Sequence, residues 1–516
     1  MIFRPARPLA LALAFAALAI AQSPDVGKRK HLIYHDIQTD ASGNIIPWYN
    51  PNPAVAYDHV LALVWNYWKH VPNYWTNNPP EYRKRYGATA GVKKYFVFRT
   101  LDDPGVGGDQ FAMALSSWSL YYAYTGDPAV LQDLRDEADI YIANSLSPST
   151  SAWPNIPYPC NTTRLAVYDG DLVAGKGFTQ PDKAGSFGAE LVTLYKITGE
   201  KKYLDVARNI ADTLAGHVQP GDNDRSPLPF RVQAETGVVK DAYTTNWTGT
   251  LRLFEGLTAL KEGDAARYQS AHRTLSDWLR QYPMKTNKWG PFFEDIVNFS
   301  QTQINAGTLA HYILEHPDWD PNWRTDVRGI QDWVIQNLGL DYWKQYGLTV
   351  IAEQTAYRIQ GQSHSSRHAS VELEYAEKTG DTSRKAEAIR LLNWATYMVD
   401  DDGKNWYPNF EVYEIWWTDG YADYVRHYLR AMAADPELAP PGQNHLLRTS
   451  SVCKQIEYQP HRVVYETFDD SGTEVLRLAA KPKQLRGVDT SNWQPLAKGG
   501  VLRLTRRGSL KVEIIL

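Results

Sequence analysis

Apolar residues recur at three- and four-residue spacing in helix-length segments along most of the chain, for example at Tyr203, Ala207, Ile210 and Leu214. This is the spacing of one face of an α-helix. Four of the turns between such segments share a Gly followed by an acid, at residues 126–127, 199–200, 263–264 and 380–381. Gly adopts the left-handed conformation that ends a helix, and the acid favours the start of the next. The pattern therefore predicts repeated helical hairpins.

The first helices of these hairpins are predicted to start near Phe111, Ser186, Trp247, Asn305, His368 and Tyr421. One pair lacks the Gly turn and runs from Ala306 to His316 and then through Trp323 to Leu338. The sixth helix, which ends near Met432, has no second helix before the Pro-rich segment 436–441. We expect the helix Ala56–His70 to supply it and close the ring. The expected fold is mainly α, an (α/α)6 toroid over residues 22–440 with an N-terminal extension; an open α-solenoid is the alternative.

After Pro440-Pro441-Gly442 the pattern changes to short alternating strands. These are predicted at residues 455–458, 463–468, 500–504 and 509–514. They indicate a small C-terminal all-β domain over residues 441–516.

The N-terminal segment has the layout of a secretory signal peptide. Arg4 and Arg7 precede an apolar run from Leu9 to Ile20, and Ala19-Ile20-Ala21 is a small-x-small cleavage site. We expect residues 1–21 to be removed from a secreted or periplasmic protein, a retained anchor being the alternative. No later stretch is long and apolar enough to span a membrane. Cys160 and Cys453 either pair in the oxidising compartment or stay reduced, and two are too few for a thiolate metal cluster.

Composition narrows the class of partner. The net charge of -4 over 516 residues gives no electrostatic reason to expect nucleic acid. The 18 Trp and 32 Tyr suit stacking on sugar rings, although aromatic residues also fill cores. Composition therefore favours a glycan as the substrate.

The loops that lead into the first helices are long and rich in acids and aromatics, whereas the Gly turns are short. In an α/α toroid the inner helices point the same way, so these loops meet at one mouth, where we expect the site. The candidate substrate-binding residues are Asp103, Asp109, Asp171, Tyr243, Trp247, Trp289, His368, Trp417 and Tyr421.

From about Ala56 to Met432, the chain resembles the six-hairpin glycosidase superfamily and the (α/α)6 polysaccharide lyases. The resemblance rests on the hairpin repeat and on the acid- and aromatic-rich lead-in loops. It implies a glycan-processing enzyme with its site at the toroid mouth, and it transfers no catalytic residue. The sequence has no glycine-rich phosphate loop, no nucleophile elbow and no CxxC pair.

Hydrolysis of a glycosidic bond needs two carboxyl groups facing each other across that bond. Glu294 or Asp295, beside aromatic residues, and Asp419 at the start of the sixth helix are the predicted pair. Asp419 as a helix N-cap, and Glu294 and Asp295 as solvated loop charges, are the alternatives.

The second hypothesis is proton abstraction next to a uronate carboxylate, as in a polysaccharide lyase. Tyr357, His364 and Arg367 supply a base and a positive group within one loop and helix start. The alternative is that the histidines are structural. A non-catalytic glycan-binding protein is the third hypothesis.

No cofactor is expected. Asp169-Gly-Asp171 is either a turn or part of a structural Ca²⁺ site, because hard cations take clustered carboxylates. His364, His368 and Glu372 are four residues apart and would share one helix face, which is weak evidence for metal ligation. Asp182 is interpreted as a helix-entry cap.

Overall fold

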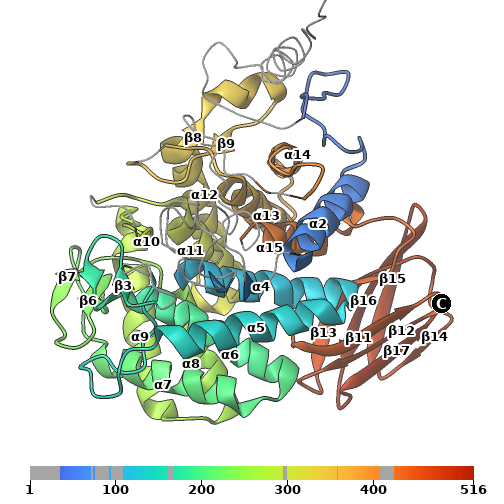
Figure 1. Cartoon of the computed structure of the whole chain (residues 1–516). Coiled ribbons are helices and arrows are strands. Elements are labelled where there is room, and N and C mark those ends of the chain that lie inside the picture. The colour runs from blue at the N-terminus through green and yellow to red at the C-terminus, as the bar shows by residue number, and fades with distance from the viewer. Residues whose placement is uncertain are drawn as a thin grey trace, which may run out of the picture.

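The computed structural model describes residues 35–70, 74–75, 92–93, 108–160, 162, 168–294, 299–356, 358–403, 405 and 423–516, with the backbone alone at 74–75, 92–93 and 108–109. Two rings of helices make up most of it (Figure 1). The inner ring comprises α4 (Gly108–Thr125), α6 (Pro181–Thr198), α8 (Thr248–Leu260), α11 (Gln303–Glu315), α13 (Gln362–Thr379) and α15 (Tyr424–Ala434). The outer ring comprises α5 (Pro128–Ser145), α7 (Lys201–His217), α9 (Ala265–Gln281), α12 (Trp323–Leu338), α14 (Lys385–Thr396) and α2 (Pro53–His70).

Each inner helix packs against the next, and α15 packs against α4, so the inner ring is closed. Burial separates the two rings. Every residue from Gln362 to Ala376 of α13 is buried, whereas α7 buries one face that includes Tyr203, Ala207, Ile210 and Leu214, as predicted. The predicted (α/α)6 toroid is confirmed.

The sixth hairpin is completed from the other end of the chain. Helix α2 contacts α5 and α14 in the outer ring. The Tyr57 hydroxyl donates to Asn393 Oδ1 on α14 at 2.6 Å, and the Tyr57 ring lies 4.9 Å from the Tyr428 ring of α15. Closure of the ring by the first helix is therefore confirmed.

The Gly turns close helices as predicted, with one difference. Gly199 ends α6 with φ of 74°, and its N–H donates to the Tyr195 carbonyl oxygen. Helix α8 instead ends at Lys261, which is itself left-handed, two residues before Gly263. The turn acid caps the next helix in α5, where the Asp127 side chain accepts from the Ala129 N–H at 2.9 Å.

Helices α6 and α8 approach each other closely because each carries Gly at the crossing. A Cβ atom on Gly249 would lie 2.5 Å from Ser186 Cα, and one on Gly185 would collide with the Thr250 side chain. Real Cβ atoms do not come this close to backbone. The two glycines therefore set the distance between these inner helices.

The C-terminal strands form two four-stranded antiparallel sheets (Figure 1). One has the order β10 (His445–Thr449), β13 (Gly472–Leu478), β16 (Gly499–Arg506), β15 (Thr490–Leu496); the other has β11 (Cys453–Gln459), β12 (Arg462–Thr467), β17 (Lys511–Ile515), β14 (Gln484–Arg486). Apolar residues of both sheets, including Val463, Leu476 and Leu502, share a second core. This confirms the predicted small all-β region after the helices.

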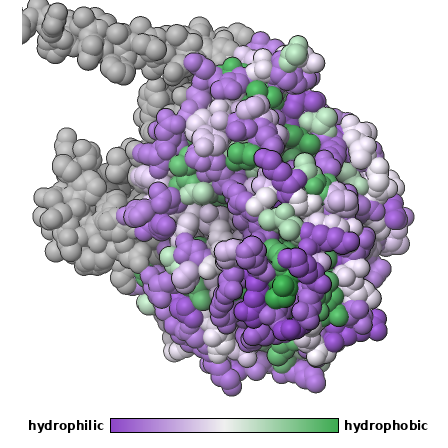
Figure 2. Space-filling model, turned by 90° about the vertical axis from the view of Figure 1, so that its right-hand side faces the viewer, coloured by the Kyte–Doolittle hydropathy of each residue, from purple (hydrophilic) through white to green (hydrophobic). Residues whose placement is uncertain are grey.

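The β region packs on the toroid through α4. The Tyr458 hydroxyl donates to the Ala123 carbonyl oxygen at 2.5 Å, and the His445 ring stacks on Tyr124 at 3.9 Å. Figure 2 shows the face of the molecule that lies on the right in Figure 1. This face is mostly hydrophilic, with hydrophobic residues in scattered spots.

Shorter elements lie in the connections between the helices. They are β1 (Tyr74–Trp75), β2 (Val92–Lys93), β3 (Gly170–Asp171), β4 (Gly175–Lys176), β5 (Phe178–Thr179), β6 (Arg231–Gln233), β7 (Val239–Asp241), α10 (Pro283–Thr286), η2 (Pro317–Trp319), β8 (Gly339–Leu340), η3 (Asp341–Tyr346), β9 (Val350–Ile351) and η5 (Pro436–Leu438).

Both cysteines are buried, and no disulfide joins Cys160 to Cys453. Burial raises the pKa of the Cys453 thiol to about 12. The predicted signal peptide lies outside the described residues and stays a prediction. Within the described part of the chain, no helix combines the length and apolar character needed to cross a membrane.

Candidate functional site

The loops that lead into α8 and α11 are connected to each other by side-chain hydrogen bonds at one end of the ring. Thr245 before α8 donates to the Trp289 carbonyl oxygen at 2.6 Å, and Thr244 donates to that of Pro291 at 2.8 Å. Asn305, in the first turn of α11, donates to the Trp289 carbonyl oxygen at 2.8 Å. These bonds fix the loop before α11 over the inner helices.

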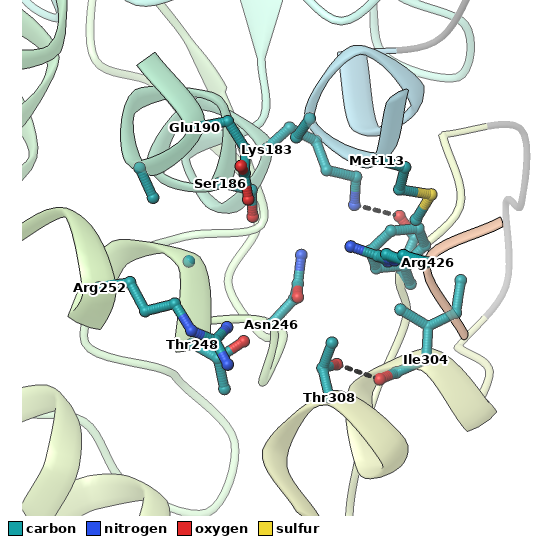
Figure 3. A pocket seen from close by; sticks show the side chains of 14 residues that line it. Met113, Lys183, Ser186, Glu190, Asn246, Thr248, Arg252, Ile304, Thr308 and Arg426 are labelled. Carbon is teal, nitrogen blue, oxygen red and sulfur yellow. Dashed lines mark hydrogen bonds between the residues drawn. The ribbon is translucent and has the colours of Figure 1, made fainter. Parts of the chain in front are cut away.

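A cavity lies inside the ring beneath these loops (Figure 3). It has about 520 Å³ of empty space, including its opening. Four inner helices, α6, α8, α11 and α15, contribute polar side chains to it, while α4 contributes Ala112 and Met113. Its lining is Ala112, Met113, Lys183, Ser186, Ala189, Glu190, Asn246, Thr248, Gly249, Arg252, Phe292, Ile304, Thr308 and Arg426.

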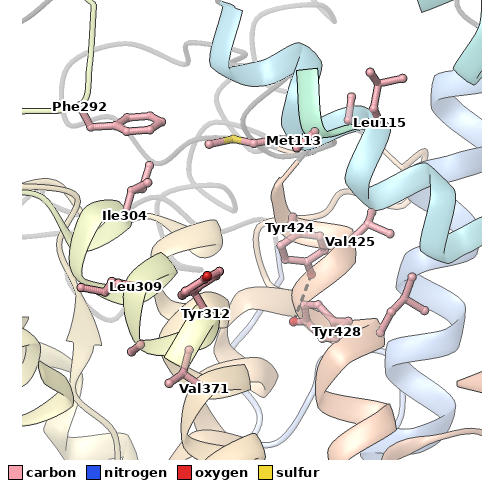
Figure 4. Close-up of a cluster of buried hydrophobic side chains, with 14 of the residues drawn as sticks. Met113, Leu115, Phe292, Ile304, Leu309, Tyr312, Val371, Tyr424, Val425 and Tyr428 are labelled. Atoms are coloured by element: carbon pink, nitrogen blue, oxygen red, sulfur yellow. Dashed lines mark hydrogen bonds between the residues drawn. The ribbon is translucent and has the colours of Figure 1, made fainter. Parts of the chain in front are cut away.

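One side of the cavity is apolar. Met113, Phe292 and Ile304 point toward the same space, and behind them the inner helices pack Leu309, Tyr424 and other buried side chains (Figure 4). An apolar wall lowers the local dielectric and strengthens the electrostatic interactions of the polar side.

Glu190, in the middle of α6, is the carboxyl group of this cavity. It forms no hydrogen bond or ion pair with any described residue. Desolvation of this partly buried side chain raises the pKa of Glu190 to about 7, against the opposing effect of Arg426, Arg252 and Arg430. A carboxyl group with this pKa changes protonation state near neutral pH, which general acid–base chemistry requires.

Arg252 belongs to a row of charged side chains along the inner helices. Its Nη2 donates to Glu315 Oε2 at 2.6 Å. The His311 ring lies between two acids, with Nε2 3.1 Å from Glu315 Oε1 and Nδ1 2.6 Å from Glu374 Oε2. Desolvation opposes ionisation of Glu315 although its side chain is partly exposed, but Arg252 and then His311 outweigh it and hold its pKa well below the usual range. Arg252 is thus fixed at the cavity by an ionised partner.

Arg426 is fixed by Asp423, to which its Nε donates at 2.7 Å. Asp423 also contacts Arg367 and accepts from His427 Nε2 at 3.1 Å. Burial lowers the pKa of Arg426 to about 10, so the guanidinium remains charged at neutral pH. The cavity therefore has guanidinium groups from α8 and α15 and one carboxyl group from α6 (Figure 3).

Lys183 joins the first turn of α6 to the mouth. Its Nζ contacts Asp182 Oδ2 at 2.8 Å, donates to the Phe292 carbonyl oxygen at 2.5 Å and lies 3.5 Å from the centre of the Phe292 ring. Asn246 donates to the same Asp182 oxygen at 3.0 Å. The interpretation of Asp182 as a helix cap is wrong, because its side chain makes this ion pair and no cap bond.

Glu294 is buried next to this wall. Arg231 Nη2 donates to the carbonyl oxygens of Phe293 and Glu294, both at 3.1 Å, and so holds the segment that carries Phe292. Asp419, the predicted catalytic partner of Glu294, lies outside the described residues. So do the other candidates Asp103, Asp295, Tyr357, Trp417 and Tyr421, together with the side chain of Asp109. Their roles stay predictions.

His364, Arg367 and His368 lie buried in the first turns of α13 and are not in the cavity lining. Arg367 Nη1 donates to Gln303 Oε1 at 2.7 Å. Burial, and then Arg367, hold the pKa of His364 well below its usual range, so the ring is neutral. His368 is also buried, and burial lowers its pKa.

The same face of α13 carries Glu372, which is bound by two arginines. Arg328 Nη1 donates to Glu372 Oε2 at 2.8 Å and Arg384 Nη1 to Oε1 at 3.2 Å. Within the described residues, no group of three His, Cys, Asp or Glu side chains is arranged to hold a metal ion.

The aromatic residues that were predicted to bind substrate and that the structure describes are buried. Trp247 and Trp289 have no exposed surface; Trp247 Nε1 donates to the Thr244 carbonyl oxygen at 2.9 Å, and Trp289 packs 6.1 Å from Trp333. Tyr243 donates to the Lys288 carbonyl oxygen at 2.5 Å. A fully buried indole offers no face to a sugar in this arrangement.

Asp171 is likewise internal. Its Oδ2 accepts from Gln180 Nε2 at 2.5 Å and from Arg231 Nε at 3.0 Å, while Oδ1 accepts from the backbone N–H groups of Val173 and Ala174. Both oxygens are therefore engaged by the protein, as expected of a turn. A structural Ca²⁺ at residues 169–171 stays a prediction.

Glu190, Arg252 and Arg426 were not predicted from the sequence, because they lie within inner helices, whereas the predicted acids lie in loops or at helix starts. The available signal was a charged residue inside an otherwise apolar inner helix, as in Gly188-Ala-Glu-Leu-Val192 and Leu251-Arg-Leu253. Charged residues are rarely buried without a partner or a function.

No protein-family model matches the chain, and no curated protein matches it. Solved structures do. A cellobiose 2-epimerase from Bacillus thermoamylovorans B4167 superposes with a TM-score of 0.51 and 15% identity, over 72% of this chain and 98% of the other. A D-mannose isomerase superposes with a TM-score of 0.50 and 10% identity, over 74% and 97%. The similarity is one of fold: the chain has the six-hairpin (α/α)6 toroid that its sequence resembles.

Proposed function

We propose that the chain is a carbohydrate-active enzyme that hydrolyses a glycosidic bond in an oligo- or polysaccharide. The observation that carries the proposal is Glu190, a carboxyl group without a protein partner, with a pKa of about 7, in a cavity at the centre of the ring. The toroid fold shared with sugar-processing enzymes supports a sugar as the ligand.

Hydrolysis requires one carboxyl group that donates a proton to the leaving oxygen and a second that acts as a base or nucleophile. Glu190 is protonated in about half of the molecules near pH 7 and fits the first role. Glu294, Asp295 and Asp419 remain the candidates for the second. Asn246 and Thr248 supply amide and hydroxyl groups for sugar hydroxyls.

Proton abstraction next to a carbonyl or carboxylate is the second candidate reaction. It is favoured by the guanidinium groups of Arg252 and Arg426, which would stabilise a developing enolate while ionised Glu190 acts as the base. The named activities of the two similar structures, an epimerase and an isomerase, are compatible with such chemistry. His364 and Arg367 are buried, and Arg367 is bonded to Gln303, so both are less suited to this reaction.

The test is to incubate the purified chain with a panel of neutral and uronic-acid polysaccharides while following reducing ends and ultraviolet absorbance together. Reducing ends without absorbance support hydrolysis; absorbance rising with them supports elimination. Glu190→Gln should lower turnover by about 10²–10⁴-fold. Glu457→Gln, the same change on the exposed surface of β11, should not alter it.

A Glu190→Gln protein that folds and retains full turnover would exclude Glu190 as the acid–base group. Tight glycan binding without turnover by the unaltered chain would contradict an enzyme and favour a binding protein.

A further inference from the structure

Arg252 from α8 and Arg426 from α15 line the cavity, and Arg430, four residues after Arg426 on α15, interacts electrostatically with both. Burial is the main cause that lowers the pKa of Arg430 to about 10, and repulsion by Arg426 adds to it. Arg426 is buried, whereas Arg252 and Arg430 are partly buried. Bringing three partly desolvated cations together is unfavourable unless negative charge compensates them.

The protein compensates this positive charge in part. Glu315 binds Arg252, and Asp423 is shared between Arg426, Arg367 and His427. Arg430 forms no hydrogen bond or ion pair with any described residue, and Nη1 of Arg426 has no bonding partner among them.

Glu190 faces these cations across the cavity without forming an ion pair with either Arg252 or Arg426 (Figure 3). The space between them can therefore receive a group of the ligand. A planar guanidinium matches a carboxylate, to which it donates two parallel hydrogen bonds.

We infer that the cavity binds the carboxylate of a hexuronic acid beside Arg426 and Arg252, and that Glu190 takes up a proton when this carboxylate binds. The inference rests on the proposed function, because it takes the ligand to be a sugar. It adds the substrate class and a coupling between binding and protonation.

The coupling follows from the charges around Glu190. Charged or titratable side chains surround Glu190 on four helices: Lys183 on α6, Arg252 on α8, His311 and Glu315 on α11, and Arg426 and Arg430 on α15. Helix α4 contributes the uncharged Met113 and Ala112. A second carboxylate in this space repels ionised Glu190 but not protonated Glu190. Above about pH 7, uronate affinity should therefore fall by about tenfold per pH unit, since one proton enters with the ligand.

The experiment is titration calorimetry of the full chain with D-glucuronate, D-galacturonate and D-mannuronate, and with D-glucose, D-galactose and D-mannose as neutral counterparts. At about pH 6, at least one uronate should bind about tenfold or more tightly than its hexose. At about pH 8, two buffers of different ionisation enthalpy should report uptake of about one proton per uronate bound.

Two variants identify the groups responsible. Glu190→Gln should bind the uronate with the same affinity at about pH 6 and about pH 8 and should take up no proton. Arg426→Gln should lose most of the preference for the uronate, whereas Arg208→Gln, on the exposed face of α7, should keep it. Glu190→Gln removes a partly buried charge and is expected to fold, so the proton measurement stands even if Arg426→Gln does not fold.

Equal affinity for uronates and hexoses, absence of uronate binding, or proton uptake that persists in Glu190→Gln would each overturn the inference. Turnover of a neutral glycan without uronate binding would overturn it and leave the proposed function standing. Proton-linked uronate binding without any turnover would support the inference and contradict the proposed function.

Discussion

Arg231 Nε lies 3.0 Å from Asp171 Oδ2, and both side chains are buried. The same guanidinium contacts Asp241 at the end of β7 and the carbonyl oxygens of Phe293 and Glu294. One side chain on β6 thus joins the lead-in loops of α6, α8 and α11. Asp171, predicted to bind substrate, is in the structure the partner that orients this arginine.

Replacing Arg231 should therefore disturb the cavity wall at a distance. Arg231→Met leaves Asp171 buried without its cation and should lower the free energy of unfolding by about 3–5 kcal/mol. The freed segment 292–294 should also raise KM, measured on whichever glycan the chain turns over. Arg225→Met, an exposed arginine before the same strand, is the control and should change neither quantity. Equal unfolding profiles for the two variants would contradict the anchoring role.

Glu190 should also make stability depend on pH. Its pKa in the folded chain, about 7, is above the 4.5 of an unperturbed Glu, so the folded state holds the proton more tightly. The free energy of unfolding should be unaffected below about pH 4.5, fall as the pH rises toward 7, and level off above it with a loss of about 3 kcal/mol. Glu190→Gln should remove this loss while all other titrations stay the same. Denaturant unfolding of both proteins at several pH values measures the difference, and parallel curves would show that Glu190 has an ordinary pKa.

The contact between α6 and α8 should tolerate no side chain at Gly249. Gly249→Ala would place a Cβ atom 2.5 Å from Ser186 Cα and should reduce the free energy of unfolding by about 1–3 kcal/mol. Gly329 in α12 has no atom within 4 Å of an added Cβ atom. Gly329→Ala should therefore raise the free energy of unfolding by about 1 kcal/mol, because Ala favours a helix over Gly. Thermal unfolding compares the two, and opposite signs are expected.

The two C-terminal β-sheets, which pack together as a β sandwich, contain a buried ion pair. Arg506 Nε lies 2.9 Å from Glu474 Oε1, and neither side chain is exposed. Arg506→Met should destabilise the sheets by about 3–5 kcal/mol, since Glu474 loses its cation in the interior. Arg507→Met, at the neighbouring and largely exposed position, should leave stability within about 0.5 kcal/mol. An early unfolding transition seen for Arg506→Met alone would show that the sandwich is the less stable part.

Much of the fold could be predicted from local pattern. The apolar spacing in α7 and the Gly after α6 are properties of single helices, so they can be read without any knowledge of packing. Even the closing role of α2 followed from counting helices, because a ring of hairpins has to be completed. The end of α8 at Lys261 rather than Gly263 could not be predicted, since either residue can close the helix.

The site was harder to predict, because burial decides which side chains are accessible to a ligand. Trp247 and Trp289 occur in loops rich in reactive residues, and the sequence does not distinguish a platform for sugar from a wall residue. Glu190, Arg252 and Arg426 are distant in sequence, and the ring brings them to one cavity. Their helices had been predicted, but not which face of each helix points to the axis.

Closure of the ring by α2 bears on how the chain folds as it leaves the ribosome. Helix α2 emerges first of the twelve that form the described ring, yet its neighbours include α14, and Tyr57 packs on Tyr428 of α15. Contacts between residues so distant in sequence carry a large loop-closure cost and form late. The growing chain therefore exposes apolar faces of α2 and α4 until α15 has been synthesised, and during this interval it is vulnerable to aggregation.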